Sequence, residues 1–191
     1  MAGLVIVLGT QGAGKSSVLS AFKQSVKVVN MGDEMLKRAM QEYGISDRDK
    51  LRTLPGYAEK SEAWRKEILA ELAKSQENSV LDTHASIKSG NRYTVGLTVE
   101  DLEELKGSAK GIIYVDATTA EIMKRRTNDK SRSRENDTAE EIDQHRNINL
   151  SLASFFSAYL NIPLYIIYNK EGALEETQNK AKEILSQLLG I

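Results

Sequence analysis

Short runs of apolar residues, many of them β-branched, alternate along this chain with longer segments that mix apolar and charged residues. Such runs, bounded by glycine or polar residues, are typical of β-strands. Five of them predict strands, at residues 4–8, 26–29, 80–81, 111–115 and 164–168. The first, fourth and fifth are almost continuously apolar, as expected of parallel strands that are covered on both faces.

The segments between these runs have the composition and periodicity of helices. We predict helices at residues 15–24, 33–43, 57–74, 98–105, from 118 or 119 to 126, 138–159 and 174–189. Thr98 and Thr138 each stand three positions before an acidic residue, which is close to a capping-box pattern. Because strands and helices alternate, we predict an α/β fold, with a doubly wound five-stranded parallel sheet flanked by helices.

Composition narrows the class of protein. The chain has 191 residues, which suits one domain, and its formal net charge of −1 gives no basic excess for binding nucleic acid or an acidic membrane. It has no cysteine, which excludes disulfides and thiolate metal sites and fits a reducing compartment. The apolar stretch at 150–168 is broken by polar residues and Pro163, so it does not predict a membrane span. We expect a soluble, cytoplasmic protein.

The segment after the first predicted strand matches the phosphate-binding pattern G-x-x-x-x-G-K-[ST] in full, and a predicted helix follows it, as this motif requires. Its residues, with the serine that comes next, are Gly9, Thr10, Gln11, Gly12, Ala13, Gly14, Lys15, Ser16 and Ser17. In such a loop the backbone N–H groups cradle the phosphates of ATP. We expect Lys15 to reach the β- and γ-phosphates and the Ser16 hydroxyl to bind Mg²⁺. The motif predicts a nucleoside triphosphate site without identifying the reaction.

Asp82 follows the short third strand, within the sequence Val-Leu-Asp-Thr-His. A carboxylate at the end of a strand beside the phosphate loop can hold Mg²⁺ through water. The alternative is that Asp82 only caps a turn. His84, two residues on, is a candidate for a phosphate contact or for a structural hydrogen bond.

Several features separate a kinase from a GTPase. The chain offers Asn169-Lys170-Glu171-Gly172 after its last strand, but glycine stands where a guanine-reading carboxylate is needed. A cluster of cations occupies residues 124–134 with few apolar neighbours, so we interpret it as a loop that closes over transferring phosphate and excludes water. The alternative is a solvated basic loop balanced by the acidic residues after it. Arg38, Arg48 and Arg52, after the second strand, are candidates to grip a second substrate's phosphate.

Several segments together carry a family resemblance. Besides the phosphate loop they include Asp82-Thr83-His84 with Ile87-Lys88, and Arg125-Arg126 with Asn128-Asp129, Arg132 and Arg134. Over nearly its whole length the chain resembles an archaeal-type adenylate kinase, a P-loop nucleoside monophosphate kinase. One departure lies at Met31-Gly32-Asp33, where the common bacterial pattern has Thr-Gly-Asp.

The resemblance implies reversible transfer between MgATP and AMP that gives two ADP, and a homotrimer. It implies one P-loop kinase domain over residues 1–191, with a monophosphate-binding segment around 30–60 and a small lid around 127–137. By position it implies lid arginines at 126, 132 and 134, which act in catalysis with Lys15. It implies AMP contacts from Gly32, Arg48, Arg52 and Lys88. Two other functions stay open: a kinase for a different nucleotide or a coenzyme precursor, and a nucleotide sensor without catalysis.

Overall fold

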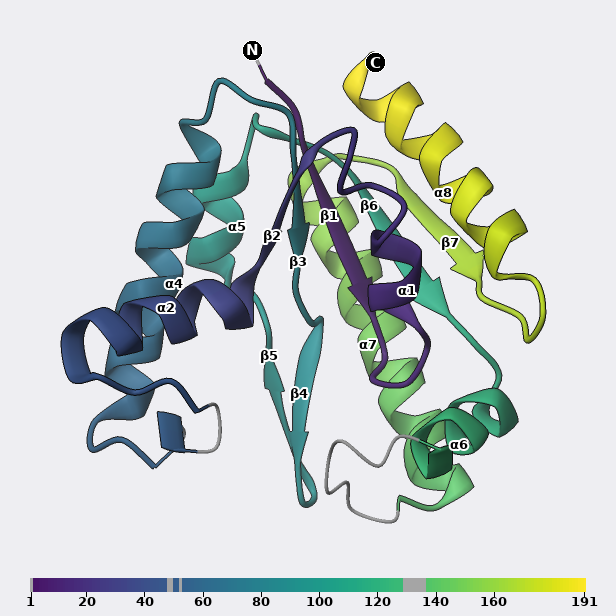
Figure 1. The fold of residues 1–191 in the computed structure, drawn as a ribbon, viewed down its shortest axis with the longest axis horizontal. Coiled ribbons are helices and arrows are strands. Elements are labelled where there is room, and N and C mark those ends of the chain that lie inside the picture. Colours follow the sequence, from purple (N-terminus) through teal and green to yellow (C-terminus); the bar gives the residue numbers. More distant parts are fainter. Residues whose placement is uncertain (1, 48–49, 52, 129–136) are drawn as a thin grey trace.

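The computed structural model describes residues 2–47, 50–51, 53–128 and 137–191. Five parallel strands form its main sheet, in the order β2-β3-β1-β6-β7 (Figure 1). These strands are β1 (Leu4–Gly9), β2 (Lys27–Asn30), β3 (Ser79–Asp82), β6 (Ala109–Asp116) and β7 (Leu164–Tyr168). The predicted five-stranded parallel α/β fold is confirmed, with each predicted strand shifted or extended by at most two residues at either end.

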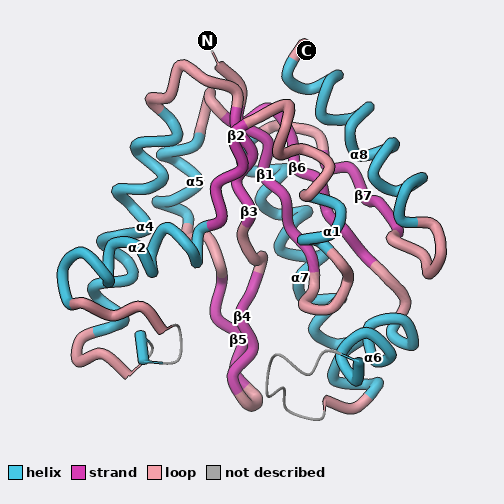
Figure 2. The backbone as a smooth tube through the Cα atoms, viewed as in Figure 1, coloured by secondary structure: helices cyan, strands magenta, loops and turns pink. Residues whose placement is uncertain are grey.

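Helices lie on both sides of this sheet (Figure 2). Those that the structure describes are α1 (Lys15–Leu19), α2 (Met31–Tyr43), α4 (Tyr57–Ala73), α5 (Val99–Leu105), α6 (Thr119–Asn128), α7 (Ala139–Leu160) and α8 (Leu174–Leu189). Capping boxes start two of them, since Thr98 and Thr138 each exchange hydrogen bonds with the acidic residue three positions later. Among the described residues there is no helix that is both long enough and apolar enough to cross a bilayer.

The strand β1 shows why its run is continuously apolar. Leu4, Ile6 and Leu8 belong to the core formed with α4, α5 and α7. Val5 and Val7 belong to the core on the opposite face, formed with α1 and α8. Because side chains alternate between the two faces of a strand, a central strand covered on both sides needs apolar residues throughout.

Three predicted helix boundaries are wrong by two residues or more, and one of them is the end of α6, which continues to Asn128 rather than stopping at residue 126. The helix that starts at Lys15 ends at Leu19 rather than at residue 24, and turns follow it. The Ser20 hydroxyl donates to the Ser17 carbonyl over 2.7 Å, and serines that bond to the backbone in this way compete with helical hydrogen bonds. The next helix, α2, starts two residues early because the Asn30 side chain accepts from the backbone N–H of Asp33 and caps it.

A hairpin that the sequence analysis missed projects beyond the main sheet (Figure 1). Its strands β4 (Ser86–Ser89) and β5 (Arg92–Val95) pair antiparallel as a separate two-stranded sheet. Gly90 and Asn91 join them, with Gly90 at φ 56°. A Gly-Asn pair between two short alternating segments is a hairpin signal, so the sequence did carry it.

Candidate active site

The phosphate-binding loop leaves the carboxyl end of β1 and enters α1. Gly12 and Gly14 have φ values of 92° and 87°, in the left-handed region that glycine adopts without strain. Ser16 and Ser17 are exposed in the first turn of α1, whereas Thr10 is only 2% exposed and turns its side chain into the protein. The backbone therefore has the conformation that the motif predicts.

Three side chains hold the carbonyl groups of this loop from outside. Arg126 donates from Nε and Nη2 to the Gln11 carbonyl oxygen, over 3.1 and 2.8 Å. The Ala13 carbonyl oxygen accepts from Arg125 Nη1 at 3.0 Å and from Asn169 Nδ2 at 2.9 Å. In a trans peptide the C=O and the next N–H point in opposite directions. The N–H groups of Gly12 and Gly14 therefore point away from these side chains, as an anion-binding loop requires.

Nothing in the sequence predicted a site contact for Asn169, and Arg125 was predicted only as part of the cationic loop at 124–134, whose residues up to Asn128 instead belong to α6. Arg125 also donates to the Asn169 carbonyl at 2.7 Å, so α6 and the loop after β7 clamp the phosphate loop together. Asn169 belongs to the Asn-Lys-Glu-Gly segment that fails as a guanine motif. Its side chain is instead buried against the loop, and nothing in its local sequence indicates this contact.

Lys15 and Asp82 form an ion pair across the ends of β1 and β3. Asp82 is 5% exposed, and its second oxygen accepts from Asn30 Nδ2 at 2.6 Å, so β2 supports it. Burial lowers the pKa of Lys15 to about 7, and the neighbouring carboxylate opposes this effect by favouring the ammonium form. The predicted phosphate-binding lysine and the predicted Mg²⁺ carboxylate are thus in direct contact.

A second group of charges joins the hairpin, α6 and α7. Lys88 on β4 donates to Asp137 at 2.6 Å and to Glu141 at 3.2 Å. Asp137 also accepts from Arg126 Nη1 at 2.5 Å. Burial works to raise the pKa of Asp137, but these two cations outweigh it and hold that pKa below its usual value. Lys88, predicted to bind AMP, and Arg126, predicted to act in catalysis, therefore share one carboxylate beside the phosphate loop.

Some of the other predicted site residues are described by the structure, and the rest lie outside the described residues. Gly32 lies in the first turn of α2, at the carboxyl end of β2. Arg48, Arg52, Arg132 and Arg134 lie outside the described residues, as does most of the predicted lid at 127–137. Arg38, also considered for a phosphate contact, pairs instead with Glu67 at 2.7 Å and Glu71 at 2.6 Å and joins α2 to α4.

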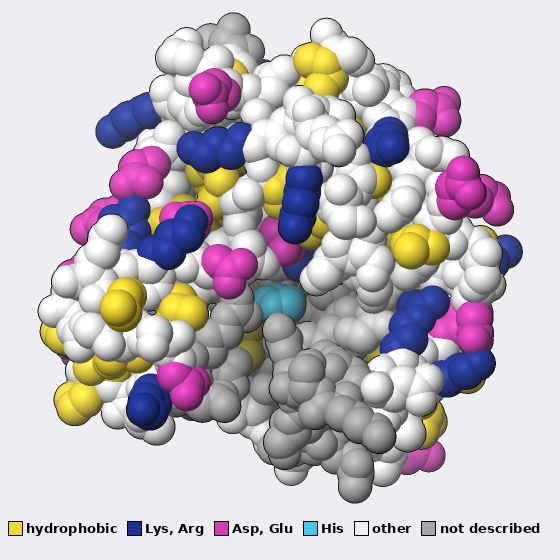
Figure 3. Space-filling model, viewed as in Figure 1, with side chains coloured by type: hydrophobic (Ala, Val, Ile, Leu, Met, Phe, Trp, Pro, Cys, Tyr) yellow, Lys and Arg dark blue, Asp and Glu magenta, His cyan; other side chains and the backbone are white. Residues whose placement is uncertain are grey.

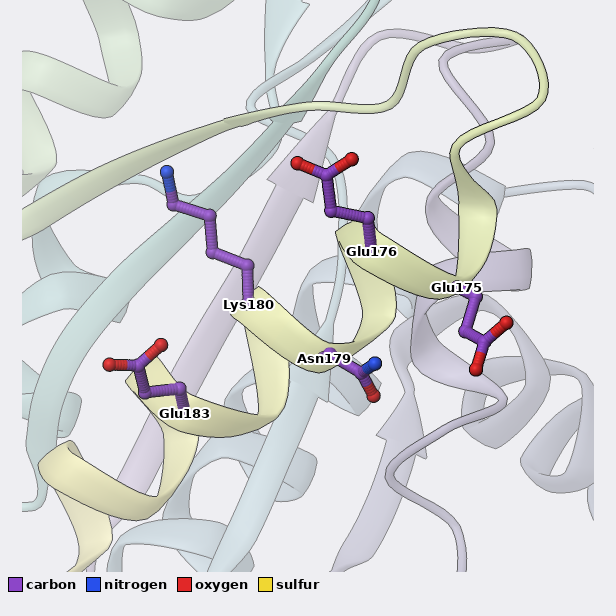
Figure 4. Close-up of a pocket in the computed structure, with 5 residues that line it drawn as sticks. All are labelled: Glu175, Glu176, Asn179, Lys180 and Glu183. Carbon is purple, nitrogen blue, oxygen red and sulfur yellow. The ribbon is translucent and has the colours of Figure 1, made fainter.

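Two other parts of the surface differ from the phosphate loop in their charge. A shallow hollow on α8 is lined by acidic, amide and lysine side chains that project from successive turns of the helix (Figure 4): Glu175, Glu176, Asn179, Lys180 and Glu183. On the face seen in Figure 3, cationic and anionic side chains are interspersed rather than gathered by sign. The hollow on α8 has three carboxylates and one lysine, so it does not offer the concentrated positive charge that a polyphosphate needs.

The loop and the sheet that carries it define the class of P-loop kinases. The fold resembles a shikimate kinase from Acinetobacter baumannii solved in complex with shikimate, with a TM-score of 0.59 and 18% identity over 99% of this chain and 96% of that one. It also resembles a gluconokinase from Sinorhizobium meliloti, with a TM-score of 0.55 and 19% identity over 98% and 94% of the two chains. At these identities the likeness concerns the fold.

Sequence comparison identifies the family within that class. The family model AAA_17, described as an AAA domain, matches residues 8–143. An adenylate kinase from Pyrococcus abyssi is 34% identical over 97% of this chain and 96% of its own length. An adenylate kinase from Methanothermobacter thermautotrophicus is 32% identical, with coverage of 95% and 98%. The chain belongs to the adenylate kinase family, as its sequence motifs indicated.

Proposed function

We propose that this protein is an adenylate kinase that transfers the γ-phosphoryl group of MgATP reversibly to AMP, giving two molecules of ADP, in the cytoplasm. The observation that carries this proposal is the phosphate loop, whose carbonyl groups are held outward by Arg125, Arg126 and Asn169. A loop fixed in this way presents its N–H groups without having to reorganise when phosphate binds. Preorganised donors of this kind supply much of the catalysis in phosphoryl transfer.

The chemistry needs positioning rather than a general base. An oxygen of the AMP phosphate is already anionic at neutral pH, and it attacks the γ-phosphorus in line with the bond to the leaving oxygen. That bond breaks as the new one forms, so the electron pair stays on the β-phosphate and two ADP result. Lys15 and the loop N–H groups stabilise negative charge on the donor. Arg126, which holds the Gln11 carbonyl and Asp137, and Lys88, which holds Asp137 and Glu141, would have to leave these partners to bind the transferring group.

The donor set fits Mg²⁺. The Ser16 hydroxyl and the Asp82 carboxylate are hard oxygen ligands at the loop and at the adjacent strand end. Among the described residues no group of three or more acidic, histidine or cysteine side chains is arranged to hold a metal. This suits a Mg²⁺ ion whose other ligands are phosphate oxygens and water. When bound, the ion neutralises charge on the β- and γ-phosphates.

The acceptor side follows from the family and from the position of the hairpin. We infer that the segment around 30–60, with Gly32, Arg48 and Arg52, holds AMP together with Lys88. Lys88 pairs with Asp137 and Glu141, and Asp137 also pairs with Arg126, which contacts the phosphate loop. The AMP phosphate has to compete with these carboxylates for Lys88. Arg132 and Arg134 complete the cationic surroundings of the phosphate when the segment around 127–137 closes as a lid.

A direct assay tests the proposed activity. Pure protein mixed with AMP and MgATP should form two ADP for each ATP consumed, and removal of Mg²⁺ with a chelator should abolish turnover. CMP, UMP, GMP and dephospho-coenzyme A in place of AMP separate this activity from that of another small-molecule kinase. ATP binding without turnover on any of these acceptors would contradict the proposal and favour a sensor.

We also propose that the protein assembles as a homotrimer. The support is the archaeal-type family resemblance, together with Phe155, a large aromatic side chain on α7 that is 47% exposed. An exposed side chain of this kind is a candidate for a contact between subunits. Light scattering on the protein as it elutes from a size-exclusion column should give a particle mass three times the chain mass of 21.2 kDa. The variant Phe155→Glu should lower the particle mass. A monomer mass for the unaltered protein would contradict the trimer.

A further inference from the structure

Five polar side chains from four parts of the chain form a continuous buried series of hydrogen bonds. Asn149 on α7 donates from Nδ2 to Thr10 Oγ1 at 3.1 Å, and its Oδ1 accepts from Ser86 Oγ at 2.6 Å. Thr10 lies 3.0 Å from the Tyr114 hydroxyl, and Ser86 lies 3.2 Å from His145 Nε2. Asn149, Thr10 and Ser86 are each 2% exposed or less.

The donor and acceptor groups of Asn149, the middle residue, and of its neighbours determine the direction of each hydrogen bond in this series. Ser86 gives its only hydroxyl proton to Asn149, so His145 must donate from Nε2 to Ser86. Burial lowers the pKa of His145 and favours the neutral ring, in which the proton then lies on Nε2. The amide of Asn149 accepts with its oxygen and donates with its nitrogen, whereas an ionised carboxylate only accepts and an apolar side chain does neither. Asn149 therefore cannot be replaced by a carboxylate or an apolar side chain without breaking at least one of the bonds.

The two residues that Asn149 contacts within the series belong to different sides of the reaction. Thr10 is the second residue of the phosphate loop. Ser86 is two residues before Lys88 on β4, so both project to the same side of that strand. The hairpin is a separate sheet with no strand pairing to the main sheet among the described residues. Beyond the backbone bonds at its base, from Thr83 to Val7 and from Gly96 to Ala85, the hairpin is held relative to the loop by side-chain contacts with α7.

We propose that Asn149 is a positioning residue for phosphoryl transfer, which fixes the hairpin that carries Lys88 against the phosphate loop through Ser86 and Thr10. The proposal rests on the proposed function, because it takes Lys88 to face the acceptor and the loop to hold the donor. Asn149 itself does not contact substrate in this role. It acts by holding two phosphate-binding elements at one separation, and displacement of about 1 Å far from the chemistry can cost up to about 10²-fold in rate.

A double-mutant cycle between Thr10→Val and Ser86→Ala tests this connection, because these two residues contact Asn149. Each variant should lower kcat/KM for ATP and calorimetric ATP affinity by about fivefold, and the double variant should lose about fivefold rather than about 25-fold, since either change breaks the same series. Asn149→Leu should match the double variant. Thr10→Ser, which keeps the hydroxyl, should restore both quantities.

The control is Thr177→Val, which removes another buried hydroxyl, on α8, whose Oγ1 donates to the Ala173 carbonyl at 2.8 Å. It should lower the unfolding temperature as Thr10→Val does and leave ATP affinity unchanged. Unaltered ATP affinity in Ser86→Ala, or losses that multiply in the double variant, would overturn the positioning role. If the unaltered protein makes no ADP from AMP, the proposed function fails. The double-mutant cycle, measured as ATP affinity, then still decides whether the hydrogen-bonded series connects the hairpin to the loop.

Discussion

Replacing Lys15 with methionine should lower kcat for ADP formation by about 10³-fold, the loss expected when one strong phosphate donor is removed. Methionine keeps most of the length of the side chain and removes its charge. The variant also leaves the Asp82 carboxylate without its ion-pair partner, and Asp82 is only 5% exposed. An unpaired buried carboxylate is destabilising, so the unfolding temperature should fall as well.

Steady-state kinetics with saturating AMP and MgATP measure this effect, and circular dichroism confirms that the variant is folded at the assay temperature. Lys23→Met serves as the matched control, because Lys23 is exposed just after α1 and lies outside the site. Its kcat should stay within about twofold of the unaltered protein, as for surface substitutions in general. A nearly normal kcat for Lys15→Met would remove the phosphate loop from the chemistry.

Replacing Gly96 with alanine should lower the free energy of unfolding by about 3 kcal/mol, near the upper end of the range for overpacking. A Cβ at this position would lie 1.7 Å from the backbone carbonyl oxygen of His84, so one of the two chain segments has to move. Gly96 N–H also donates to the Ala85 carbonyl at 2.8 Å, which ties the end of the hairpin to the segment after Asp82. The movement should therefore disturb Asp82 and reduce activity too.

Urea denaturation followed by circular dichroism measures this loss. Gly90→Ala is the informative comparison, because Gly90 has φ 56° but no atom within 4 Å of the position of an added Cβ. It should cost only about 1 kcal/mol, for the left-handed backbone alone. Equal losses in the two variants would show that the close approach of His84 to Gly96 is not what makes alanine costly there.

The hairpin that contains Ile87 and Lys88 shows where prediction from local sequence patterns failed. The sequence analysis used Lys88 only as a residue implied by family resemblance and predicted no strand around it. Each strand of the hairpin has only four residues and lies outside the main sheet. Each strand therefore has few apolar residues and only a short alternation of apolar and polar positions. The Gly-Asn turn was the usable signal.

What the sequence alone determined was the order along the chain of the main-sheet strands and of the helices, the parallel sheet, the phosphate loop and its lysine, and the family. These features depend on neighbouring residues: apolar runs of strand length, helical periodicity and a motif of eight consecutive positions.

Only the tertiary structure decided which side chains support the site. Asn169 reaches Ala13 across 156 positions of the chain, Arg125 reaches the same carbonyl across 112, and Asn149 reaches Thr10 across 139. Local patterns specify which way a helix or strand faces, but they do not specify which distant side chain meets a given carbonyl group. That choice is made when the carboxyl ends of β1, β6 and β7 come together at one edge of the sheet beside α6 and α7, and buried polar groups must then find partners there.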